Sequence, residues 1–187
     1  MESNHASSDP RDVAAELADA EAMRSQLAGS LRLPPWFHAS IGAAISIQIG
    51  TATYTLATPG ASVLVLVAGL LVFATVAAVQ LARFRRLNGV WVGGLASRAV
   101  LGTSTLSSVV YAGSLAGAVW AGLAGLGWLA ALAAAAGGIG YATCERRWWN
   151  AYLRDPAEHA RAEPPRYLAG LAIVAVLGMV ALLLGRG

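Results

Sequence analysis

The sequence predicts an all-α integral membrane protein, a helical bundle of two transmembrane hairpins plus a fifth transmembrane helix, preceded by a cytosolic amphipathic helix. Hydrophobic residues make up 57% of the 187 residues and charged residues only 12%, whereas soluble domains carry about 25% charged residues. The mean hydropathy is +0.59. Five long stretches contain no Asp, Glu, Lys or Arg, and a membrane-spanning helix needs about 20 mostly apolar residues. These observations exclude a water-soluble fold and a disordered chain.

Residues 1–35 form the predicted cytosolic segment, with an amphipathic helix over 10–31. Asp9 is a suitable N-cap and Pro10 suits the first helical position, while Pro34-Pro35 ends the helix. Apolar residues recur at spacings of three and four along it. The helix either lies on the membrane surface or pairs with another helix. Its acidic outer face disfavours anionic headgroups and favours a protein partner.

Two hairpins follow, predicted over 36–82 and 100–143. Each joins two apolar stretches through a turn without charge, because Thr58-Pro59-Gly60 and the Gly-rich residues 122–125 favour tight turns. Residues 167–187 supply the fifth helix and a short tail. The predicted spans are 36–57, 61–82, 100–122, 126–143 and 167–185.

Two Arg-rich connections, over 83–99 and 144–166, set the predicted orientation. Arginine close to helix ends marks the cytoplasmic side of a membrane. We therefore expect a multi-pass protein of the cell (plasma) membrane, with both connections and the N-terminus in the cytoplasm and the C-terminus outside.

Small residues recur every four positions in several of the predicted spans. Apolar side chains gain nothing by leaving lipid for one another, so membrane helices associate where small residues let backbones approach closely. These stripes predict the seams of the bundle, and the alternative is that one of them forms the interface of a homo-oligomer. The residues are Gly42, Ser46, Gly50, Gly113, Gly117 and Gly138.

Gln48, Gln80 and Tyr111 are the candidate intramembrane polar site. An amide at membrane depth must face another helix or water, since lipid offers no hydrogen-bond partner. Simple interhelical hydrogen bonding is one interpretation, and a substrate path lined by Gln48 and Tyr111 is the other.

Arginines and aromatic residues gather at the cytosolic ends of both hairpins. In the simpler interpretation these arginines extend to lipid headgroups, the Trp and Tyr residues anchor the interface, and Glu145 pairs with a neighbouring Arg. In the alternative, the arginines together bind an anionic lipid or a phosphate-bearing ligand. The residues of this candidate site are Arg83, Arg85, Arg86, Arg146 and Arg147.

Several classes of site find no support in the sequence. Cys144 is the only cysteine, which excludes an intrachain disulfide. No His, Cys and acid cluster has metal-ligand spacing, and no nucleophile or phosphate-loop motif is present. We expect no catalytic residue, no cofactor, no metal and no nucleic-acid partner, the net charge being only +3. His38 fits an interfacial anchor, which leaves no ionisable group at membrane depth and disfavours proton-driven transport.

The segment Arg85-Arg86-Leu87-Asn88-Gly89-Val90-Trp91-Val92, with Leu33-Pro34-Pro35-Trp36-Phe37 before it and Arg146-Arg147-Trp148 after it, resembles a family of small, uncharacterised actinobacterial multi-pass membrane proteins. The resemblance covers about residues 20–161 and implies the two-hairpin fold. The fifth helix is additional to that pattern. The resemblance implies no catalytic residue.

These patterns favour a non-enzymatic membrane protein, namely a scaffold, an accessory subunit or an immunity-type component that works by binding membrane lipids or a protein partner through its N-terminal helix. Transport of a small or lipophilic substrate by an oligomer is the alternative. A membrane-embedded enzyme acting on a lipid-like substrate is a further alternative, and it would need a true site at Glu145 and the neighbouring arginines.

Overall fold

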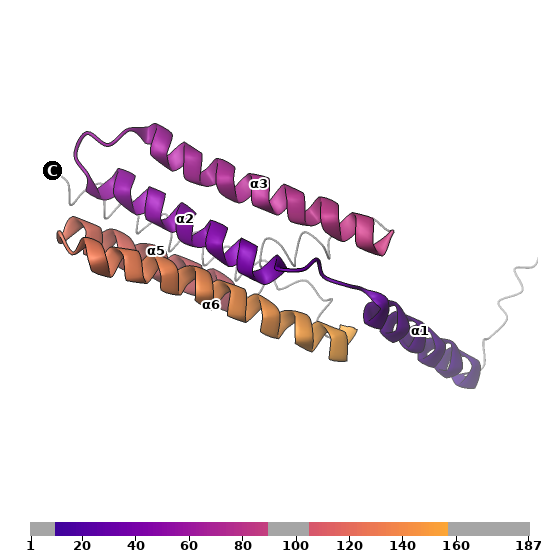
Figure 1. Ribbon diagram of the computed structural model, residues 1–187. Helices are drawn as coiled ribbons and strands as arrows, with labels where there is room; N and C mark the ends of the chain where they lie inside the picture. The colour runs from indigo at the N-terminus through magenta and orange to yellow at the C-terminus, as the bar shows by residue number, and fades with distance from the viewer. Residues whose placement is uncertain (1–9, 90–104, 157–187) are drawn as a thin grey trace, which may run out of the picture.

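The computed structural model describes residues 10–89 and 105–156, and within these ranges every regular element is an α-helix (Figure 1). The all-α prediction is confirmed to this extent. Asp9, most of the connection 83–99 and the predicted fifth span lie outside the described residues. The helices are α1 (Pro10–Ser30), α2 (Phe37–Ala57), α3 (Val63–Asn88), α5 (Thr105–Leu123) and α6 (Gly127–Arg154).

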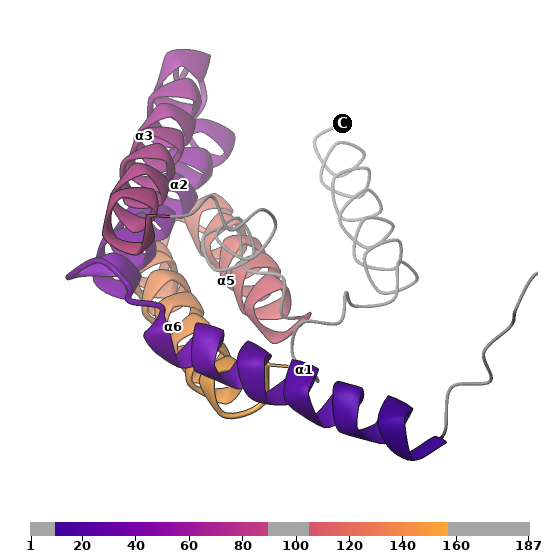
Figure 2. The same cartoon turned by 90° about the vertical axis from the view of Figure 1, so that its right-hand side faces the viewer.

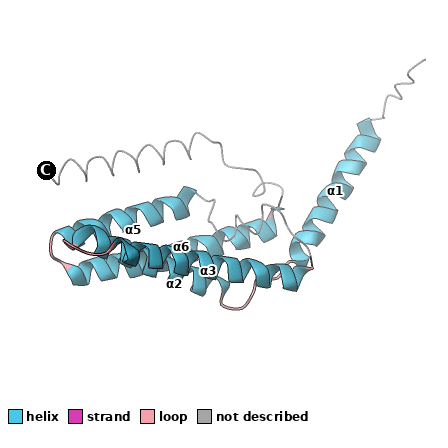
Figure 3. Ribbon diagram, turned by 90° about the horizontal axis from the view of Figure 1, so that it is seen from above, coloured by secondary structure: helices cyan, strands magenta, loops and turns pink. Residues whose placement is uncertain are grey.

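Four of these helices form the bundle, as two hairpins whose helices run roughly along one direction (Figure 1). Helix α2 is at its centre and packs against α3, α5 and α6, while α5 also packs against α6. Helix α3 packs mainly against α2. Helix α1 leaves one end of the bundle and runs across its long axis, with a small contact to α6 (Figures 2 and 3).

Within residues 10–89 and 105–156, three helices are long and apolar enough to cross a membrane: α3, α5 from Leu106 onward, and α6. Helix α2 is not among them, because Gln48 and a run of threonines lower its hydropathy. It is also the helix with the most protein neighbours, so these polar side chains can face other helices. The chain is therefore consistent with a membrane protein, and five spans and their orientation stay predictions.

Asn88 holds the linker between α1 and α2 against the end of α3. Its side-chain amide nitrogen donates to the Arg32 carbonyl at 3.0 Å, and its Oδ1 accepts from the Arg32 N–H at 2.9 Å. Gly89 follows with φ of +66° and ends α3, a conformation that glycine adopts without steric cost. The Asn88-Gly89 pair thus both ends α3 and holds the chain that enters the bundle.

The backbones of α2 and α6 approach each other closely at Gly42 and Gly138. A Cβ atom built on Gly42 would lie 2.7 Å from the Gly138 carbonyl oxygen, and one on Gly138 would overlap the Ser46 hydroxyl. By contrast, a Cβ on Gly50, Gly113 or Gly117 would meet nothing within 4 Å. Of the small-residue stripes, the one through Gly42, Ser46 and Gly138 lies at a tight helix–helix contact.

Substitution of Gly138 by Ala is expected to lower the thermal unfolding temperature of the protein in mild detergent by several degrees. The added methyl group must push α2 and α6 apart, and overpacking of this kind costs about 1 to 3 kcal/mol. Gly117→Ala is the matched control, since it adds the same methyl group in open space and improves helix propensity. Circular dichroism melting curves measure both variants, and equal melting temperatures would contradict the assigned seam.

Candidate functional site in the bundle interior

A pocket of about 280 Å³ lies inside the bundle and takes lining residues from all four of its helices. Because α3 packs mainly against α2, the pocket occupies the space between α3 and α5, with α2 and α6 behind it. Its lining residues are Ile45 and Gln48 of α2, Leu70 and Phe73 of α3, Ser108 and Tyr111 of α5, and Tyr141 of α6.

Gln48 and Tyr111, paired on sequence grounds alone, meet at this pocket. The Tyr111 hydroxyl donates a hydrogen bond of 2.7 Å to Gln48 Oε1, which turns the amide nitrogen of Gln48 away from the phenol. The side chain of Gln48 makes no other hydrogen bond to a described residue. In an apolar medium an N–H group without an acceptor costs several kcal/mol, on the order of 2 to 7. The pocket therefore presents two amide N–H donors near the middle of α2.

Gln80, the third residue of the candidate polar site, lies elsewhere. Its amide nitrogen donates to the Ser40 hydroxyl at 2.6 Å, and Ser40 in turn donates to the Phe37 carbonyl at 2.9 Å. Gln80 is 3% exposed, and its Oε1 has no hydrogen-bond partner. It therefore joins α3 to the first turn of α2 and does not line the Gln48–Tyr111 pocket.

Glu145 is buried inside the bundle, 3% exposed. The pairing of Glu145 with a neighbouring arginine, which one interpretation of the sequence expects, is not what the structure shows. The Ser107 hydroxyl is its hydrogen-bond partner, and Oε1 has none. The physical reason is that α6 continues without a break to Arg154, so Glu145 shares the buried face of Tyr141, one turn earlier. In the sequence, small and aromatic residues recur at spacings of three and four from Ala134 to Tyr152. This spacing is the signal that could have located Glu145 on the buried face.

The Gln48–Tyr111 pair and the Ser107–Glu145 pair lie at successive levels along the bundle. Ser107 precedes Tyr111 by one turn of α5, and Glu145 follows Tyr141 by one turn of α6, so both steps lead toward the same end of the bundle. The Ser107–Glu145 pair is thus one helical turn from the pocket, on the side where α3 and α6 end (Figure 1). An acidic side chain that is buried among membrane helices is a candidate functional group.

The five candidate arginines are all exposed and lie near the ends of α3 and α6. These two helix ends are at the same end of the bundle (Figure 1), and they meet through Phe84 and Trp149, whose ring centroids are 6.5 Å apart. Trp148 stacks on Tyr152 beside this contact, at 5.6 Å. The aromatic residues thus hold the two ends together, and Arg83, Arg85, Arg86, Arg146 and Arg147 surround them.

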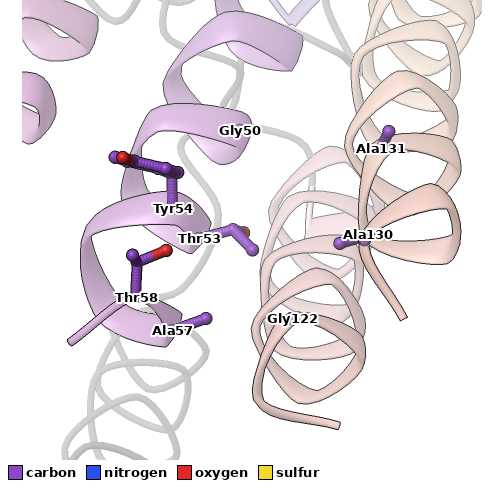
Figure 4. A pocket seen from close by; sticks show the side chains of 9 residues that line it. Gly50, Thr53, Tyr54, Ala57, Thr58, Gly122, Ala130 and Ala131 are labelled. Atoms are coloured by element: carbon purple, nitrogen blue, oxygen red, sulfur yellow. The ribbon is translucent and has the colours of Figure 1, made fainter. Parts of the chain in front are cut away.

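A second hollow, of about 290 Å³, lies at the opposite end of the bundle, among α2, α5 and α6. Thr53 and Ala57 point from α2 toward Gly122 and Ala130, while Tyr54 points away (Figure 4). The Thr53 hydroxyl oxygen is buried without a hydrogen-bond partner. The other walls are mostly glycine and alanine, which offer a ligand neither charge nor side-chain hydrogen bonds.

Metal-binding and thiol chemistry find little support in the part of the chain that the structure describes. These residues contain no group of three His, Cys, Asp or Glu side chains that could hold a metal ion. Cys144 is a free, partly buried thiol.

Comparison with protein-family models finds no match to this chain, and comparisons with curated proteins and with solved structures also find none. The resemblance to small actinobacterial membrane proteins stays a prediction.

The Gln48–Tyr111 hydrogen bond is expected to contribute about 0.6 kcal/mol, and at most about 1.7 kcal/mol, to the stability of the bundle, the range found for such bonds in membrane proteins. A double-mutant cycle of Gln48→Met and Tyr111→Phe, followed by thermal unfolding in detergent, measures it. Tyr54→Phe is the control, because its side chain points away from α5 and α6 (Figure 4) and is 53% exposed. A coupling of zero would show that the two side chains do not interact.

Proposed function

We propose that this protein is a non-enzymatic, multi-pass protein of the cell membrane that binds a lipophilic molecule through a hydrogen-bond acceptor on that molecule. The unpartnered amide N–H group of Gln48 in the intramembrane pocket carries the proposal. The apolar helices support a membrane setting. The arginines at one end of the bundle support a cytoplasmic N-terminus and an extracytoplasmic C-terminus, by the preference of arginine for the cytoplasmic side.

The residues that line the pocket indicate the chemistry of the ligand. A carbonyl, ether or hydroxyl oxygen would accept from Gln48, while Ile45, Leu70 and Phe73 would contact an apolar body. Pockets for drug-sized ligands enclose about 300 to 1,000 Å³, so a volume of about 280 Å³ suits a ring or the polar end of a longer molecule. The amide and phenol groups bind and orient such a molecule, and catalysis would need an activated nucleophile or a positioned acid–base pair in addition.

Transport is the second use that the same interior supports, and one observation favours it. Polar side chains lie at three levels along the bundle, at Thr53, at Gln48 with Tyr111, and at Glu145 with Ser107. A substrate that crosses the membrane needs a succession of such partners. In an oligomer, a second copy would widen the route.

Gln48→Met is expected to reduce the amount of bound lipophilic ligand about tenfold. Methionine keeps the length of the side chain and removes the hydrogen-bond donors, and a lost hydrogen bond of 1 to 2 kcal/mol corresponds to roughly that factor. The protein is purified from native membranes in mild detergent, extracted with organic solvent and analysed by mass spectrometry. Thr55→Val is the control, because its hydroxyl only donates to the Thr51 carbonyl of its own helix. Equal recovery from wild type and Gln48→Met would contradict the proposal.

Helix α1 favours a second candidate function, the binding of a protein partner. Leu17 and Leu27 are 60% and 68% exposed, and the acidic Glu16 and Asp19 are exposed beside them. The last turn of this helix has no basic residue that would favour an anionic membrane surface. The partner is therefore a protein that presents an apolar patch next to basic side chains.

A photoreactive amino acid in place of Leu17 is expected to cross-link to one discrete protein in native membranes. Replacement of Glu16 and Asp19 by Gln and Asn should weaken this product severalfold, because the charge attraction is lost. The control replaces Ser25 and Gln26, also exposed, by Ala. Cross-links to lipid alone would place α1 on the membrane surface and contradict the partner.

A further inference from the structure

A groove of about 520 Å³ lies between α2 and α6, and it shares no lining residue with the Gln48–Tyr111 pocket. Its walls are mostly Ala and Gly, together with Ile139. It runs beside the tight contact of Gly42 with Gly138. At one end it reaches His38 and Arg146, so the groove is apolar along its length and cationic at its end.

The length of this groove matches one leaflet of a bilayer. At 1.5 Å per residue, the 11 steps from Ala135 to Arg146 rise about 16 Å along α6. Half of a hydrocarbon layer of about 30 Å is about 15 Å. Because Arg146 lies at the end where the other exposed arginines are, the cationic end of the groove is at the level of the headgroups and its apolar part faces the acyl chains.

The cationic end of the groove can bind an anion. Arg146 is exposed and makes no ion pair with a described residue. His38 lines the same end of the groove and is partly exposed. A phosphate group fits both, because a guanidinium forms paired hydrogen bonds with phosphate oxygens and an imidazole N–H donates a further one.

We propose that this groove binds an anionic phospholipid. One acyl chain lies along the wall formed by Ala39, Ala43 and Ile139, where the absence of large side chains gives it room. The headgroup phosphate contacts Arg146, and His38 donates to it. Charge and length together favour a lipid as the occupant, since an uncharged chain would leave Arg146 without a partner and a free anion would leave the apolar groove empty.

Native mass spectrometry of the full chain in mild detergent, with equal amounts of phosphatidylglycerol and phosphatidylcholine added, tests the proposal. The wild type is expected to retain at least about fivefold more phosphatidylglycerol, the ratio that one arginine near a headgroup provides at about 1 kcal/mol. Arg146→Gln should abolish this preference and Arg146→Lys should keep part of it. Arg154→Gln, an exposed arginine of α6 outside the groove and outside the candidate arginine site, should leave it unchanged.

Substitutions of two neighbouring alanines form a matched pair that tests the apolar part of the groove. Ala135 and Ala136 are both exposed, but only Ala135 lines the groove. Ala135→Leu should reduce retention of both lipids severalfold, whereas Ala136→Leu should not. Four results would each overturn the proposal. The first is the absence of a preference in the wild type, and the second is an equal effect of Arg146→Gln and Arg154→Gln. The third is an effect of Arg146→Gln with none of Ala135→Leu, which indicates a free-phosphate site. The fourth is conversion of a dimer to a monomer by Ala135→Leu, which indicates an interface between two copies.

Discussion

The close contact of α2 with α6 at Gly42 and Gly138 is the constraint on which the rest of the bundle depends. A Cβ on Gly42 would lie 2.7 Å from the Gly138 carbonyl oxygen, so only glycine at both positions allows the backbones to come this near. In lipid, helices associate through such dispersion contacts because no hydrophobic driving force acts between them. The contact fixes α2 at the centre, with α6 on one side and α3 on another. The Gln48–Tyr111 pocket and the groove between α2 and α6 both follow from that placement.

Polar side chains in the interior are distributed in a way that the lipid environment explains. Most of the threonine and serine hydroxyls on α2 donate to carbonyl groups of their own helix, as Thr51 does to Gln48 and Thr55 does to Thr51, and so they need no other partner. Gln48, Gln80 and Glu145 are too long for this solution. Each finds one partner on another helix, at Tyr111, Ser40 and Ser107 respectively, and each keeps an unpartnered polar atom. These three residues therefore mark where the interior can accept a ligand, a water molecule or a proton.

The sequence predicts much of this fold, because the signals for membrane helices are long and local. The first helix was expected over 10–31 and is observed as Pro10–Ser30, and the turn at Thr58-Pro59-Gly60 separates α2 from α3. The cost of polar groups in lipid grouped Gln48, Tyr111 and Gln80 in one candidate site, and the structure joins only the first two by a hydrogen bond. The position of Glu145 did not follow, because the charged residues after it suggested the end of the span, while the buried face of α6 continues through Trp149. The sequence also could not show which glycine of a stripe contacts another helix. Gly117 and Gly138 have similar neighbours in the chain, but Gly117 lies in open space and Gly138 lies against α2.

One turn of α6 contributes to both the interior and the lipid-facing groove, and this connects the two sites. Glu145 and Arg146 are consecutive, and successive residues of a helix point about 100° apart. The carboxyl group of Glu145 therefore faces Ser107 inside the bundle, while the guanidinium of Arg146 lines the outer groove beside His38. In the proposed lipid site, a headgroup bound to Arg146 would restrain the rotation of this turn, and with it the direction of the Glu145 side chain.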